Sequence, residues 1–124
     1  MPAKNDALFK ISKLEHNDGV IGATLDINKD CDIFKGHFPG HPVVPGACML
    51  QMVKDVLEEA LITSLRLKKA EHLKFIAMID PGKTHSVHLG MSYKFIDEDS
   101  VNVGAKLITG EVVCFKFQGT FIKE

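Results

Sequence analysis

Apolar and polar residues alternate with a period of two along much of this chain. Within residues 21–28 the apolar positions are Ile21, Ala23, Leu25 and Ile27. A period of two puts apolar side chains on one face of an extended segment, so this pattern predicts a half-buried β-strand. Residues 7–15 show no helical stripe and are interpreted as an earlier strand. The Asp18-Gly19 pair between the two segments is a strong hairpin signal.

The second half of the chain repeats the alternation in four segments, at residues 73–79, 87–95, 101–107 and 113–121. Turn-forming residues separate them: Asp80-Pro81-Gly82, residues 97–100 and Thr109-Gly110-Glu111. Short turns join antiparallel neighbours, so these segments are predicted to form an antiparallel sheet. Residues 63–70 carry several basic side chains and are interpreted as an exposed helix end or loop.

Residues 47–61 are apolar around most of a helical circumference, which is typical of a buried helix. Gln51 and Asp55 are the polar side chains in its first half, and their spacing puts them on one helix face. A helix buried on most sides requires a sheet that curls around it and a second subunit as well. The predicted fold class is α+β, a long antiparallel sheet wrapped around one central helix, in a single domain over residues 1–124.

A loop rich in proline and glycine, residues 36–46, precedes this helix. Its three prolines each fix φ and restrict the preceding residue, so helix is nearly excluded from 36 to 45. A rigid loop that carries His37 and leads to a helix N-terminus suits chemistry, and a plain structural connection fits the local pattern equally well. His37 and His41 are four residues apart, a spacing that converges only on a helix, so no metal site is predicted. His41 is interpreted as a surface residue.

Composition and charge limit the classes of function. The formal net charge of −1 arises from 15 basic and 16 acidic residues, which gives no general attraction to nucleic acid or membrane. No segment resembles a signal peptide or reaches transmembrane length, so a cytoplasmic location is expected. The three cysteines form no CxxC motif, which argues against a disulfide framework and a zinc ribbon. Cys48 is interpreted as a small buried hydrophobe.

One local cluster is basic, and it consists of Arg66, Lys68, Lys69 and Lys74. Such a cluster would suit an acidic carrier protein. It is also what an ordinary solvated surface looks like, and the sequence leaves both readings open.

The segment Gly36-His37-Phe38-Pro39-x-x-Pro42-x-x-Pro45-Gly46 resembles the active-site signature of the hot-dog-fold 3-hydroxyacyl-ACP dehydratases of fatty-acid synthesis. The predicted order of strands and helix and the Asp80-Pro81-Gly82 turn also fit that family. The resemblance implies a hot-dog fold whose two protomers join their sheets. It also implies an active site at the dimer interface, in a tunnel that receives the acyl chain from acyl carrier protein.

The resemblance further implies roles for individual residues. His37 would be the base that takes the C2 proton of the substrate, held by a hydrogen bond to the carbonyl of Val43. The backbone N–H of Gly46 would stabilise negative charge on the thioester oxygen. Phe38, Val43 and Gly46 are the implied substrate-binding residues.

The chain departs from the family at the acid. The family has Glu or Asp where this chain has Gln51, and commonly has Gln one helical turn later, where this chain has Asp55. An amide can hydrogen-bond a hydroxyl but cannot give it a proton. We therefore predict that Asp55 is the acid and Gln51 orients the hydroxyl, with His37 as the third catalytic residue. A solvated, non-catalytic Asp55 is the alternative.

The predicted activity is dehydration of 3-hydroxyacyl-ACP to trans-2-enoyl-ACP, in fatty-acid or related acyl-chain synthesis, without metal or cofactor. The expected assembly is a homodimer or a dimer-based oligomer. One alternative is a catalytically impaired hot-dog subunit that binds acyl chains or supports an active partner in a heterodimer. Another is an acyl thioesterase in which Asp55 activates water.

Overall fold

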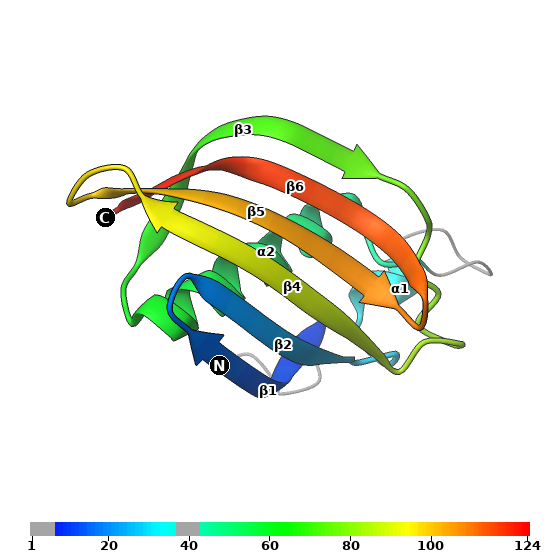
Figure 1. Cartoon of the computed structure of the whole chain (residues 1–124). Coiled ribbons are helices and arrows are strands. Elements are labelled where there is room, and N and C mark those ends of the chain that lie inside the picture. Colours follow the sequence, from blue (N-terminus) through cyan, green and yellow to red (C-terminus); the bar gives the residue numbers. More distant parts are fainter. Residues whose placement is uncertain (1–6, 37–42) are drawn as a thin grey trace.

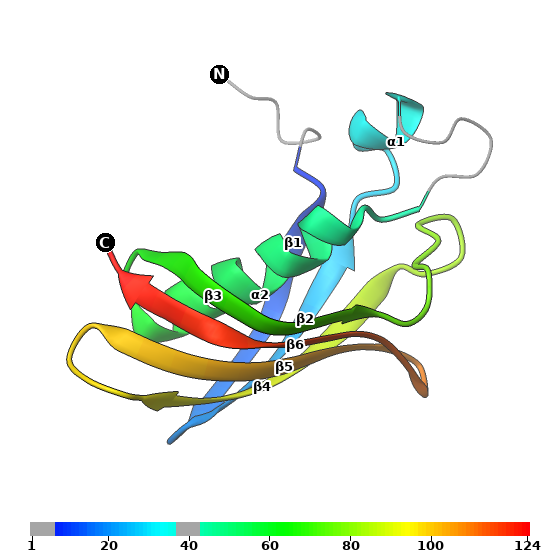
Figure 2. The same cartoon turned by 90° about the horizontal axis from the view of Figure 1, so that it is seen from above.

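A computed structural model describes residues 7–36 and 43–124 as one curved sheet with a long helix on its concave side (Figures 1 and 2). The sheet has six antiparallel strands in the order β1-β2-β4-β5-β6-β3. The elements are β1 (Phe9–Asn17), β2 (Val20–Ile27), α1 (Ile33–Gly36), α2 (Gly46–Leu61), β3 (Leu65–Phe75), β4 (Ser86–Phe95), β5 (Ser100–Thr109) and β6 (Val112–Lys123). The predicted α+β fold class is confirmed.

Tight turns produce most of the strand pairing. Gly19 joins β1 to β2 with φ of 80°, and Gly110 joins β5 to β6 with φ of 60°. Both values lie in the left-handed region that glycine adopts without strain. Between β4 and β5 the Asp97 carboxylate accepts hydrogen bonds from the N–H groups of Asp99 and Ser100, both at 2.8 Å. The hairpins predicted at these three places are confirmed.

Helix α2 follows Pro45, whose carbonyl accepts hydrogen bonds from the N–H groups of Cys48 and Met49 at 3.0 and 3.3 Å. One stripe of the helix is buried against the sheet and consists of Met49, Met52, Val53, Val56 and Leu57. The opposite side is exposed or partly exposed, so the burial predicted on most sides depends on the second subunit and stays a prediction. The apolar residues of α2 outside this stripe are therefore not covered by the chain's own sheet.

The segment around β3 differs from the prediction in two ways. Residues 65–75 form an edge strand, although 63–70 were expected to be a helix end or loop. An edge strand with both faces near solvent needs no alternation of apolar residues. The basic residues of β3 therefore gave no sign of a strand in the sequence. The turn at Asp80-Pro81-Gly82 exists, with the Asp80 carboxylate accepting from the Gly82 N–H at 2.8 Å. It nevertheless does not join neighbours, because β3 pairs with β6 and not with β4.

The loop before α2 is described only at its two ends. Helix α1 ends at Gly36, so the predicted exclusion of helix from 36 onward fails at its first position. Residues 43–45 are not helical, as expected. In the parts of the chain that the structure describes, we find no helix long and apolar enough to cross a membrane.

Candidate functional site

Four of the predicted site residues lie on α2 or just before it. Gly46 is the first residue of the helix, Gln51 and Asp55 follow on its outward side, and Val43 precedes it. His37, Phe38 and His41 lie outside the described residues. The predicted roles of His37 and Phe38, and the rejected metal pair of His37 with His41, therefore stay predictions.

The chain just before α2 is fixed to the connection between β3 and β4. The backbone N–H of Val44 donates to the carbonyl of Ile79 at 2.9 Å, and both side chains are buried. Val43 is only partly buried. This anchor holds the end of the loop against the core while the Val43 side chain stays next to solvent.

Gly46 lies directly beneath the ring of Phe75, the last residue of β3. A Cβ added to Gly46 would be 2.7 Å from two carbons of that ring, closer than side chains tolerate. The ring is 52% exposed and stacks on buried Phe115, with ring centroids 5.1 Å apart. Phe75 therefore forms one wall at the N-terminus of α2, where unpaired N–H groups favour negative charge.

Gln51 and Asp55 form a hydrogen-bonded pair on the outward face of α2. The Gln51 Nε2 donates to the Asp55 Oδ1 at 2.6 Å. Gln51 is exposed and Asp55 is partly buried. Their predicted placement on one face is confirmed, and the contact gives the carboxyl group a fixed orientation. An oriented carboxyl beside an amide can hold a hydroxyl and exchange a proton with it.

A cysteine nucleophile on α2 and a metal site have less support than the Gln51–Asp55 pair. Burial, with a smaller effect of nearby Cys31, raises the pKa of the Cys48 thiol above its usual value. A raised pKa keeps the thiol protonated at neutral pH, which argues against a thiolate nucleophile. In residues 7–36 and 43–124 we find no group of three His, Cys, Asp or Glu side chains arranged to hold a metal ion.

Sequence reasoning missed Phe75 as part of this site. It stands in an exposed edge strand, and its contact with Gly46 joins residues that are far apart in the chain. The only signal was the glycine at the helix start, since glycine often marks a close approach.

A family model described as ApeI-like, ApeI dehydratase, matches residues 12–103. A 3-hydroxyacyl-[acyl-carrier-protein] dehydratase FabZ from Latilactobacillus sakei is 29% identical over 89 residues, which cover 66% of this chain and 63% of that relative's length. The chain thus spans less than two thirds of that protein.

Solved structures share the fold at lower sequence identity. The dehydratase heterocomplex ApeI:P from Xenorhabdus doucetiae aligns with a TM-score of 0.72 and 16% identity, covering 92% of this chain and 97% of that one. A thioesterase, HI1161 from Haemophilus influenzae, aligns with a TM-score of 0.64 and 11% identity, covering 94% and 78%. The family match spans most of the chain, and the sheet and helix are those of hot-dog proteins. The chain therefore belongs to the ApeI-like family of hot-dog-fold dehydratases.

Proposed function

We propose that this protein removes water from 3-hydroxyacyl thioesters carried by acyl carrier protein and releases trans-2-enoyl thioesters. The single observation that carries the proposal is the Gln51–Asp55 hydrogen bond on the outward face of α2. It orients a carboxyl group one helical turn from the family's acid position. The family match and the dehydratase name of the Latilactobacillus relative support the same reaction class.

The proposed reaction moves two protons. The His37 imidazole takes the C2 proton, and the electron pair of that bond becomes the new C2–C3 double bond. The C3–O bond breaks as protonated Asp55 gives its proton to the departing hydroxyl, which leaves as water. Gln51 holds the hydroxyl by hydrogen bonding. The N–H of Gly46 stabilises the charge that develops on the thioester oxygen. Return of the proton from His37 to Asp55 completes the cycle.

The proposed site is shared between two chains. Strand β3 is an edge strand and leaves one row of backbone groups without a partner strand. Large apolar side chains are exposed along β3 and beyond its end, among them Phe75 and Met78, the latter at 81%. Within residues 7–36 and 43–124, no segment covers the outward face of α2. A second protomer joined at β3 would extend the sheet and cover these apolar groups.

The alternative is a subunit that binds acyl chains or supports an active partner. The amide at Gln51 favours it, because the family's acid position holds no acid here. The heterocomplex named for the Xenorhabdus structure provides a precedent for two unlike chains. A thioesterase activity is a further alternative. The reason to consider it is the similarity in fold to the thioesterase HI1161.

Comparison of four proteins distinguishes these functions. Each is incubated with 3-hydroxyacyl-ACP, and the masses of the products are measured by mass spectrometry. The four proteins are the parent, Asp55→Asn, Gln51→Glu and the swap of Gln51→Glu with Asp55→Gln. If Asp55 is the acid, Asp55→Asn loses about 10²- to 10⁴-fold in rate and the swap recovers it. An inactive parent that Gln51→Glu alone activates would support the impaired subunit. Release of free acyl acid would support the thioesterase.

A further inference from the structure

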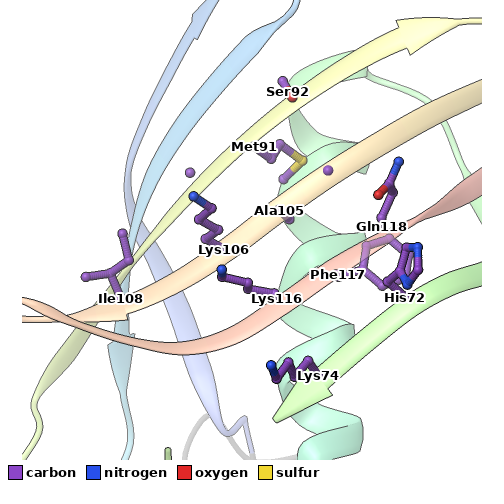
Figure 3. A pocket seen from close by; sticks show the side chains of 12 residues that line it. His72, Lys74, Met91, Ser92, Ala105, Lys106, Ile108, Lys116, Phe117 and Gln118 are labelled. Carbon is purple, nitrogen blue, oxygen red and sulfur yellow. The ribbon is translucent and has the colours of Figure 1, made fainter. Parts of the chain in front are cut away.

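Three lysines lie side by side on the face of the sheet that is turned away from α2 (Figure 3). In the strand register Lys74 of β3 is opposite Lys116 of β6, and Lys116 is opposite Lys106 of β5. All three are exposed. Like charges directly opposite each other destabilise a sheet. Among the described residues, no carboxylate makes an ion pair with any of the three.

The same row of residues continues into a hollow. Gly90 of β4 is opposite Lys106, and Gly104 of β5 is opposite Ser92 of β4. The missing side chains leave room above the strands, and the hollow has a volume of about 680 Å³. That volume lies within the range of small-molecule sites, roughly 300 to 1,000 Å³.

The chain's own packing does not explain the glycines of this hollow. A Cβ added to Gly90 would have no atom within 4 Å, and one added to Gly104 would meet only the Ser92 hydroxyl at 3.8 Å. Their φ values are also outside the left-handed region. Glycine weakens a strand, so Gly90 and Gly104 lower the stability of the sheet. The row of three lysines lowers it as well.

The lysines and the hollow together define the chemistry of a ligand. Lysine ammonium groups bind phosphate oxygens as point charges. Adjacent strands are about 4.8 Å apart, so the three lysine positions span roughly 10 Å, enough for more than one phosphate group. His72 and Ser92, which also line the hollow, supply further hydrogen-bonding groups. The glycine floor is free of side chains and could accept a flat ring.

We propose that this face of the sheet binds a small polyphosphorylated molecule of the nucleoside diphosphate class. Its phosphates contact Lys74, Lys106 and Lys116, and its ring system lies over Gly90 and Gly104. The chain has a formal net charge of only −1, so this attraction is local to one face. The site is on the opposite side of the sheet from α2 and is independent of the proposed dehydratase site.

Isothermal titration calorimetry of the full chain with ADP at low salt tests this proposal. We expect saturable binding of one ADP per chain that weakens as salt rises, weaker binding of pyrophosphate, and none of adenosine. Lys106→Glu and Lys116→Glu should each lower the ADP affinity at least tenfold. Lys94→Glu is the matched control, because it makes the same charge change on the same face at a residue that does not line this hollow. Lys94 lines a neighbouring hollow that shares Ser92, Gly104 and Gln118 with it, so this variant should lose clearly less ADP affinity than Lys106→Glu.

A second variant separates the ring from the phosphates. Gly90→Leu fills the hollow without a change of charge, so it should weaken ADP binding at least tenfold and pyrophosphate binding much less. Its unfolding curve in urea checks that the sheet is intact. Absence of saturable ADP binding would overturn the proposal, as would an equal loss in Lys94→Glu. Capture of an acidic carrier protein by these lysines, with no ADP binding, would overturn it in favour of a protein partner.

Discussion

Gly119→Ala should destabilise the protein strongly, because a side chain at this position of β6 would overlap the backbone of β3. Gly119 is opposite Ala70, in a part of β3 with register shifts on both sides. An added Cβ would overlap the carbonyl oxygen of Lys69, lie 2.6 Å from the Cζ of Phe117 and lie 3.2 Å from the Cα of Ala70. Two of these three atoms belong to the backbone, so a side-chain rotation cannot relieve the overlap.

The magnitude follows from the kind of atom that must move. Overpacking in a well-packed core typically costs about 1–3 kcal/mol. Because the β3 backbone itself must shift here, we expect a loss of about 3 kcal/mol in the free energy of unfolding. For a chain of this size that is a fall in Tm of roughly 10 °C. The assay is urea unfolding followed by far-UV circular dichroism, at one fixed protein concentration because association also changes stability.

Gly104→Ala is the control for this prediction. It makes the same chemical change in the neighbouring strand, where the nearest atom to the new Cβ is 3.8 Å away. Alanine is favoured over glycine in a strand by about 0.5–1 kcal/mol, so this variant should be as stable as the parent or slightly more stable. A Gly119→Ala protein within about 0.5 kcal/mol of the parent would refute the packing argument.

Three further predictions concern α2 and the turns. Gly46→Ala should displace the Phe75 ring from Phe115 and lower stability by about 1 kcal/mol, and the loss should vanish in a Phe75→Ala background; equal losses in both backgrounds would contradict the contact. Burial raises the pKa of Cys48 above the usual 9.0, so its alkylation should stay slow at pH 8 and accelerate only above pH 9. The native state keeps this proton when the unfolded state loses it, so the thiol's contribution to stability falls as pH rises past 9; fast alkylation of the folded protein at pH 7 would contradict this. Hydrogen bonds from the turn's N–H groups lower the pKa of Asp97 below its ordinary 3.8, so its contribution is present above that pH and is lost as pH falls further. Asp97→Asn should therefore flatten the fall of Tm between pH 5 and 3, and an unchanged slope would contradict it.

The hydrophobic pattern was sufficient for the elements whose two faces differ. Strands β2, β4, β5 and β6 each bury one face, so each carries a clear period of two in sequence. Helix α2 buries only one stripe, although its sequence is apolar around most of its circumference. Strand β3 buries only Leu65. Its place at the sheet edge depends on pairing with β6, which is distant in sequence, and no local period records that.

The candidate site was predictable to the extent that it is local. Gln51 and Asp55 share a helix face because of their spacing, and their hydrogen bond follows from it. The Phe75 ring over Gly46 was not predictable, because it depends on how the end of β3 meets the start of α2. The proposed exchange of acid and amide depends on the resemblance to the family signature, and it stays a prediction.

The most direct test of the central claim is the mass of the acyl chain after incubation of 3-hydroxyacyl-ACP with the parent protein. We predict an acyl chain lighter by one water molecule, still attached to the carrier protein, and a large loss of that product with Asp55→Asn. An unchanged substrate with the parent would contradict the account. So would full parental activity in Asp55→Asn, because the proton would then come from another group.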